Sequence, residues 1–320
     1  MALPPLSSSG LKNVFATLDS MPPESFDTAQ ERLEALFLLD RFLANARSEN
    51  TPILGDLYRK RGEKVLREIM DYKGNVPRLW KLYSSGIIIK SGEDVLAYDL
   101  TDGCESHPFS CRLNLGDELI KAFAKVITAY FATHEHSDHF TPLLADELLQ
   151  QGKTVLTTES AVKFWCLPEY CNAEKYSFPG MHPFHSFQLP SSGARGPGIG
   201  VPNTAFLQEL PTGNLFVKGD IYTDKEILEA VACYDQQGLT VDFAPLSSYH
   251  IQPTSMTDEL LKRDCSLFFP IHEWEFSHRP YGKEGGATQS YEFLAGEFAP
   301  CAALGRRRLL TWGESAPLVK

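Results

Sequence analysis

The chain contains no long hydrophobic run, and its basic residues are outnumbered by acidic ones. No stretch approaches the ~18 consecutive apolar residues of a transmembrane helix, so we expect no membrane span. The 30 Lys and Arg residues face 41 Asp and Glu residues, which gives a formal net charge of -11. This charge disfavours binding to nucleic acid or to an anionic membrane surface, because both repel an acidic protein. We therefore expect neither as a partner.

Signals for cysteine pairing are also missing. The seven cysteines are scattered, odd in number and contain no Cys-x-x-Cys pair, which predicts free thiols in a reducing compartment. The Pro- and Ser-rich start of the chain has neither the basic beginning nor the apolar core of a secretory signal. The sequence therefore predicts a cytoplasmic protein.

Metal-ligand side chains, by contrast, are concentrated near the middle of the chain. Three of the nine histidines and one aspartate fall within a single short stretch, at His134, His136, Asp138 and His139. Neutral imidazoles and carboxylates bind zinc and similar divalent ions. At these spacings the side chains would spread around a helix, so a loop after a strand is their better host. The apolar, β-branched residues 126–132 predict that strand.

Two other interpretations of this stretch are less favourable. A metalloprotease helix of the His-Glu-x-x-His type is excluded, because Asp138 occupies the position of its second histidine. A solvated polar turn would crowd three imidazoles and two acids together without a use for them, which is costly. A metal site is therefore the preferred hypothesis.

Strand and helix patterns alternate on both sides of this loop. Strands are predicted at 82–90, 95–99, 126–132, 154–157, 186–189, 203–210, 214–218, 242–246 and 266–272. Helices are predicted at 116–125, 143–151, 160–165 and 256–260. The first two strands form a hairpin. The repeated strand–helix–strand order implies an α/β fold.

The N-terminal region has a different pattern. Amphipathic helices are predicted at 30–46 and 56–72, and their periodicity places Arg32 on the polar face of the first. We therefore predict an N-terminal helical extension (1–72) before an α/β domain (73–320). The extension would act as a cap over the site, as a dimerisation arm or as a buttress packed on the sheet.

The His-x-His-x-Asp-His stretch resembles the signature of the metallo-β-lactamase superfamily. From about Lys81 to Phe276, the pattern is similar to the branch that contains L-ascorbate-6-phosphate lactonase. Two later segments support the resemblance, because an apolar strand is followed by Gly-Asp at Asp220 and another ends in Pro-x-His at His272. The resemblance implies a metallo-β-lactamase-like αββα sandwich with metals at one edge.

Through this resemblance, the expected metal ligands fall into two sets that share one aspartate. The first set is His134, His136 and Asp220, and the second is Asp138, His139, Asp220 and His272. Asp138 would also act in catalysis, by orienting the attacking water or accepting its proton. Zinc is the expected metal, with manganese and iron as alternatives, because mixed histidine and carboxylate ligands suit all three.

The chain departs from the family pattern where a third histidine would complete the first set. Ser191 and Ser192 stand at that position, and His182 and His185 lie upstream, where they would serve only in a different register. A serine, a water or a distant residue would fill the gap, or one metal would bind weakly. The sequence therefore leaves open whether one or two ions bind.

Four further residues are expected to support or line the site. Asp99 ends the first hairpin, where the family has an acid that supports the metal loop from behind, although an ordinary turn aspartate fits as well. Arg195 would clamp an anionic substrate group or remain a solvated loop residue. Tyr249 and His250 would line the pocket or belong to the surface or core.

The resemblance implies a metal-dependent hydrolase that uses a metal-bound hydroxide to cleave an ester-like bond, either a sugar-phosphate lactone or a phosphodiester. The expected substrate is therefore a small anionic molecule. The alternative is a degenerate or mononuclear member that acts as a metal-dependent binding module without hydrolysis. A homo-oligomer is compatible with either function.

Overall fold

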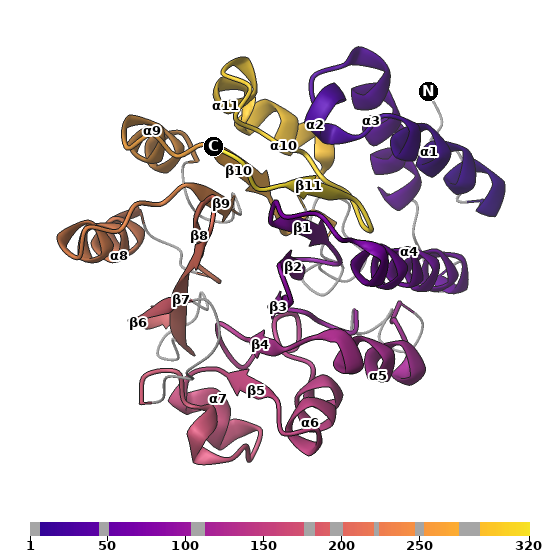
Figure 1. Ribbon diagram of the computed structural model, residues 1–320. Helices are drawn as coiled ribbons and strands as arrows, with labels where there is room; N and C mark the ends of the chain where they lie inside the picture. The colour runs from indigo at the N-terminus through magenta and orange to yellow at the C-terminus, as the bar shows by residue number, and fades with distance from the viewer. Residues whose placement is uncertain are drawn as a thin grey trace.

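The computed structural model describes residues 7–44, 51–103, 113–175, 183–192, 201–220, 224–246, 253–274 and 289–320. Within these ranges, two β-sheets lie face to face and helices cover their outer sides (Figure 1). The predicted α/β sandwich is therefore confirmed. Among the described helices, none is both long and apolar enough to cross a membrane.

The first sheet has six strands in the order β11-β1-β2-β3-β4-β5. They are β1 (Arg78–Lys81), β2 (Ile87–Ser91), β3 (Asp94–Tyr98), β4 (Ala129–Phe131), β5 (Thr154–Leu156) and β11 (Ser315–Pro317). The β3–β4 and β4–β5 pairs are parallel, and the other pairs are antiparallel. The segments that follow β3 and β4 therefore leave the sheet at the same edge.

The second sheet has five strands in the order β10-β9-β8-β7-β6. They are β6 (Phe184–Ser192), β7 (Val201–Leu210), β8 (Gly213–Val217), β9 (Phe243–Leu246) and β10 (Leu267–Pro270). Because β8, β9 and β10 are parallel, the segments that follow them also meet at one edge. Carboxyl-terminal edges of parallel strands are the usual place for sites in α/β folds.

Alternating side chains of each strand point to opposite faces, which gives two apolar layers. In β2, Ile87 and Ile89 belong to the core between the sheets, whereas Ile88 packs toward the helices. Aromatic rings fill the core between the sheets, with the Tyr98 and Phe131 rings stacked at 4.7 Å. The buried Tyr98 hydroxyl donates to Oε1 of Gln208 at 2.7 Å, so the two sheets also share a satisfied polar contact.

Eleven α-helices and one 3₁₀ helix are present in the described ranges. They are α1 (Ser8–Ser20), α2 (Pro23–Phe26), α3 (Gln30–Ala44), α4 (Thr51–Asp71), α5 (Asp117–Val126), α6 (Pro142–Gln150), α7 (Glu159–Phe164), η1 (Glu169–Cys171), α8 (Asp224–Gln236), α9 (Pro253–Lys262), α10 (Tyr291–Glu297) and α11 (Ala299–Ala303). Helices α8 and α9 cover the outer side of the second sheet, and α4, α5 and α6 lie beyond the first (Figure 1).

The N-terminal helices are bound to the C-terminal segment by buried polar contacts. Arg32 of α3 is fully buried and forms a two-pronged ion pair with Glu314, with nitrogen–oxygen distances of 2.7 and 2.8 Å. Asp40 of the same helix accepts the backbone N–H groups of Tyr291 and Glu292, both at 2.8 Å, and so caps α10. These helices pack on the same hydrophobic core as the outer face of the first sheet. The division into two units at residue 72 stays a prediction.

We expect Arg32→Leu to destabilise the protein by about 3–5 kcal/mol, because Glu314 would be left as an unpaired buried charge. The loss should appear as a lower urea midpoint in equilibrium unfolding. The double variant Arg32→Leu/Glu314→Leu removes both charges and should recover part of the loss, because Leu309 O still loses the donor that Arg32 supplied. A wild-type urea midpoint in Arg32→Leu would contradict this prediction.

Several predicted boundaries were wrong. Helix α4 begins at Thr51 rather than at residue 56, because Pro52 is tolerated in a first helical turn, where its missing N–H is not needed. The predicted strand 82–90 is instead a turn at 82–86 followed by β2. The strand expected to end at residue 189 continues to Ser192, with a bulge between Leu189 and Ser192.

Candidate metal centre

The loop that carries the histidine cluster leaves the end of β4 and is fixed at both ends. At its start, the N–H of Thr204 in β7 donates to Thr133 O at 2.9 Å. At its end, the Tyr130 hydroxyl lies 3.1 Å from His139 O and accepts the N–H of Thr141 at 3.0 Å. Both sheets therefore hold the loop in place, and Nε2 of His134 and Nε2 of His139 face Asp220 of the second sheet.

Asp99 lies directly behind this loop. It follows β3 with a φ of 45° and is fully buried. Its Oδ1 accepts the N–H of Thr133 at 2.7 Å, and its Oδ2 lies 2.9 Å from Nδ1 of His139. A carboxylate at Nδ1 keeps the proton on that nitrogen and leaves Nε2 available as a metal ligand.

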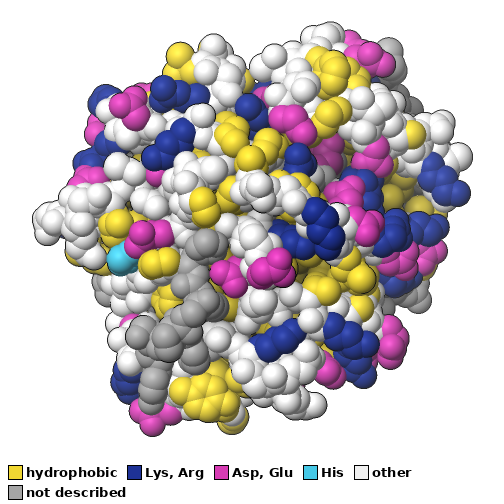
Figure 2. Space-filling view, viewed as in Figure 1, with side chains coloured by type: hydrophobic (Ala, Val, Ile, Leu, Met, Phe, Trp, Pro, Cys, Tyr) yellow, Lys and Arg dark blue, Asp and Glu magenta, His cyan; other side chains and the backbone are white. Residues whose placement is uncertain are grey.

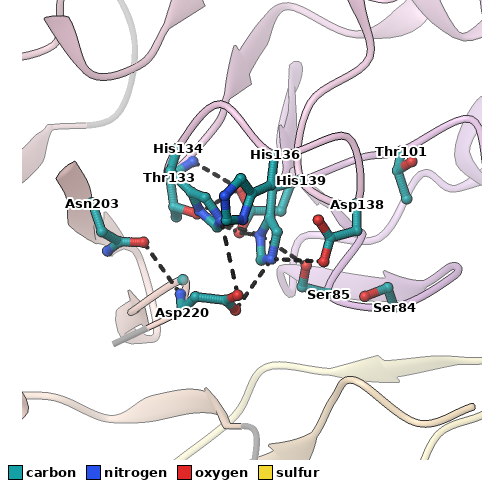
Figure 3. A network of polar contacts seen from close by, with 12 residues as sticks. Ser84, Ser85, Thr101, Thr133, His134, His136, Asp138, His139, Asn203 and Asp220 are labelled. Carbon is teal, nitrogen blue, oxygen red and sulfur yellow. Dashed lines mark hydrogen bonds and ion pairs between the residues drawn. The ribbon is translucent and has the colours of Figure 1, made fainter. Parts of the chain in front are cut away.

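Asp220 enters the site from the other sheet, just after β8. The preceding Gly219 has a φ of 60°, and a Cβ there would meet Thr133 Oγ1 at 2.5 Å, so the close approach requires glycine. The Oδ1 of Asp220 lies 3.1 Å from Nε2 of His139 and 3.2 Å from Nε2 of His272. Figure 3 shows the Asp220 carboxylate facing the histidine loop.

His272 follows β10, the last strand of the second sheet. Its φ of 65° turns the chain sharply after the strand, and its N–H donates to Ser84 O at 3.2 Å. The His272 ring lies 5.2 Å from the His139 ring, and both Nε2 atoms face Asp220. The structure thus brings together four segments that are far apart in the sequence.

The ligand-type side chains form two adjacent clusters. One consists of His134, His136 and Asp220, and the other consists of Asp138, His139 and His272. Within each cluster, one ligand atom from every residue lies within 4.8 Å of the others. His134 Nε2 and His136 Nδ1 are 3.0 Å apart. Imidazole nitrogens and carboxylate oxygens at such separations fit a divalent ion of the zinc type.

Burial and the neighbouring charges shift the pKa values of the buried centre in different directions. Burial lowers the pKa of His139, but Asp220 and Asp99 outweigh that effect and raise it well above its ordinary value. Burial raises the pKa of Asp220, but His139 and His272 outweigh it and hold it well below its ordinary value. Burial and the neighbouring His139 hold the pKa of His134 well below its usual range. Asp220 is therefore a carboxylate, and His134 is neutral, as a metal ligand must be.

The other predicted residues have different outcomes. Arg195, Tyr249 and His250 lie outside the described residues. Ser191 and Ser192 form the end of β6, and their side chains lie outside the described part of the structure, so their role at the site stays a prediction. His185 is half-buried and its Nε2 lies 2.7 Å from Glu209 Oε1 on β7, so it belongs to a cross-strand pair and to neither cluster.

Sequence reasoning missed three hydroxyl groups at the centre. Thr133 Oγ1 lies 3.1 Å from Nδ1 of His134 and donates to Asp99. Ser85 Oγ lies 3.1 Å from Nδ1 of His139, and Ser84 Oγ lies 3.4 Å from Nδ1 of His272. The Ser-Ser-Gly sequence at 84–86 is a turn signal, but it was read as part of a strand.

Comparison with known proteins identifies the fold. No protein-family model matches the chain, and no curated protein matches it. A possible metal-dependent hydrolase from Veillonella parvula is similar in structure, with 11% identity, a TM-score of 0.54 and coverage of 76% of this chain and 100% of that one. Igni18, a metallo hydrolase from Ignicoccus hospitalis, has 12% identity, a TM-score of 0.51 and coverage of 75% and 97%. The isothiocyanate hydrolase from Delia radicum gut bacteria has 12% identity, a TM-score of 0.50 and coverage of 75% and 98%. The chain therefore has the metallo-β-lactamase fold.

Proposed function

We propose that the protein is a metal-dependent hydrolase that cleaves an ester-like bond. The observation that carries the proposal is the convergence of two ligand clusters, drawn from both sheets, around the Asp220 carboxylate. The likeness in fold to a metallo hydrolase from Ignicoccus hospitalis supports it. The proposed substrate is a sugar-phosphate lactone, as in the lactonase-like branch, or a phosphodiester.

The residues that would hold the metal follow from the two clusters. Asp138, His139 and His272, with Asp220, would hold one ion, and His134 and His136, with Asp220, would hold another. Zinc is the proposed metal, and manganese or iron would also suit this donor set. A divalent metal bound here acidifies water and stabilises negative charge on the entering and leaving oxygens.

The chain's own residues supply the proton transfer and the orientation. Asp138 is buried, and its Oδ2 lies 3.5 Å from His139 Nε2, so its carboxylate would be close to a water held by a metal in this cluster. It would orient that water and accept its proton. Asp99 keeps the Nδ1 proton of His139 in place, so the imidazole presents the same nitrogen to the site throughout the reaction.

The proposed partner is a small anionic substrate rather than nucleic acid or a membrane surface. Positive and negative side chains are interspersed on the face shown in Figure 2, and the net charge is -11. A local dication can still attract an anion to an acidic protein. We propose a cytoplasmic location, and a homo-oligomer is compatible with this function.

We expect protein purified without chelator to contain about two metal equivalents. It should cleave an activated lactone or phosphodiester, and a chelator should remove that activity because the water would lose its activating ion. Metal analysis by inductively coupled plasma mass spectrometry and a chromogenic ester panel would measure both. A metal-free protein would contradict the proposal.

Retained metal without turnover across ester classes would instead favour a metal-dependent binding module. One observation supports this second candidate, because Ser191 and Ser192 stand where the family has a third histidine. Among the described residues, the cluster of His134, His136 and Asp220 thus has two imidazoles rather than three. Re-addition of zinc, manganese or iron to the stripped protein would separate the two functions, since only the hydrolase recovers cleavage.

A further inference from the structure

The turn between β1 and β2 brings two consecutive serines to the back of the metal centre. Ser84 and Ser85 are both buried, with 0% and 2% of their surface exposed. The turn is closed by the Leu82 N–H, which donates to Gly86 O at 2.8 Å, and by the Gly86 N–H, which donates to Tyr83 O at 3.0 Å. The serine side chains are therefore held in fixed positions within the fold.

Each serine hydroxyl faces a different imidazole. Ser85 Oγ lies 3.1 Å from Nδ1 of His139, and Ser84 Oγ lies 3.4 Å from Nδ1 of His272. Figure 3 shows both serines on this turn, near Asp138 and His139. The Nε2 atoms of the same two rings point the other way, toward Asp220. The turn thus contacts the two rings of one ligand cluster from behind.

A buried ion pair fixes the turn to the strand end that carries His272. Lys81 Nζ donates to the carbonyl oxygens of Leu82 and Ser84 and lies 3.0 Å from Oε1 of Glu273. The Lys81 and Glu273 side chains are only 1% and 0% exposed. Because the His272 N–H also donates to Ser84 O, the serine and the imidazole cannot shift independently.

On the proposed function above, we propose that Ser84 and Ser85 are positioning residues that orient the imidazoles of His272 and His139 for metal binding. When Nε2 is a metal ligand, the proton of a neutral imidazole is on Nδ1, and each serine oxygen accepts that N–H. Loss of the Ser85 hydroxyl leaves His139 with the Asp99 carboxylate, which lies 2.9 Å from its Nδ1. Ser85 is the second acceptor for the Nδ1–H of His139.

The backbone of Ser84 supports a role for its hydroxyl. Its φ is 55°, a conformation that glycine adopts without cost and other residues adopt at a cost of about 1 kcal/mol. A glycine would therefore fit this turn at least as well. The contact between the serine oxygen and His272 is the feature that glycine would not supply.

The Ser84→Gly variant separates the two roles. We expect its metal-free form to unfold at the same urea midpoint as the wild type or a higher one, since the backbone strain is relieved. Its affinity for zinc, measured by competition with a chromophoric chelator, should fall about 10- to 100-fold. Ser85→Ala should weaken zinc binding less. Ser91→Ala, at an equally buried serine at the far end of β2, is the control and should bind zinc like the wild type.

Two results would overturn the inference. The first is wild-type zinc affinity in Ser84→Gly, and the second is a loss of affinity accompanied by a lower urea midpoint of the metal-free protein, as expected for a purely structural serine. If the wild type itself does not bind zinc, manganese or iron, the proposed function fails, and the inference fails with it.

Discussion

Asp220→Asn is expected to abolish hydrolysis and to reduce metal binding at both clusters. The Asp220 carboxylate lies 3.1 Å from Nε2 of His139, 3.2 Å from that of His272 and 3.9 Å from that of His134. Asparagine keeps the shape but removes the negative charge and one acceptor oxygen. Loss of a shared ligand should cost more than the about 10- to 100-fold in affinity that an outer partner contributes. Metal analysis after gel filtration and turnover of the same ester substrate would measure the change.

Asp242→Asn provides a matched control for this experiment. Asp242 is also a buried aspartate of the second sheet, but it precedes β9, at the opposite end of the strands from Asp220. Its Oδ2 accepts the N–H of Asn214 at 2.8 Å. This variant should lose some stability and keep its metal. Wild-type metal content in Asp220→Asn would show that Asp220 is not a ligand.

The fold class was predictable because its signals are local. The apolar strand before the histidine loop, the Thr141-Pro142 start of α6 and the hairpin between β2 and β3 are each encoded within a few residues. The approach of Asp220 and His272 to the loop was not a local signal, and its prediction depended on the resemblance to a known family. Parallel pairing of β8, β9 and β10 is the physical reason that these distant residues meet.

The features that sequence reasoning missed depend on tertiary contacts. Helical periodicity placed Arg32 on a polar face, yet its side chain is buried and forms an ion pair with Glu314, which is distant in the sequence. Strand β11 is only three residues long and gains its stability from pairing with β1, across most of the chain. The hydroxyl of Thr141 illustrates the same limit. It occupies the predicted N-cap position of α6 but donates to Leu100 O at 2.9 Å instead of capping the helix.

His139→Ala and His272→Ala are each expected to remove one metal ion and leave the other. The cluster of Asp138, His139 and His272 is the better supported, because Asp99, Ser85 and Ser84 hold its two imidazoles from behind. In the other cluster, Oδ2 of Asp220 lies 3.9 Å from Nε2 of His134. We therefore expect the tighter ion to depend on His139 and His272.

His134→Ala should remove the weaker ion instead, so the variants form a set with opposite outcomes. In zinc titration, His139→Ala and His272→Ala should lose the high-affinity phase, and His134→Ala should lose the low-affinity phase. His185→Ala is the matched control, since this half-buried histidine pairs with Glu209 on the second sheet and touches neither cluster. If both His139→Ala and His272→Ala keep wild-type stoichiometry, the assignment of ligands to the tighter site is wrong. Loss of the high-affinity phase in His134→Ala would instead show that the cluster of His134, His136 and Asp220 binds the tighter ion. The missing third histidine would then have no effect on affinity.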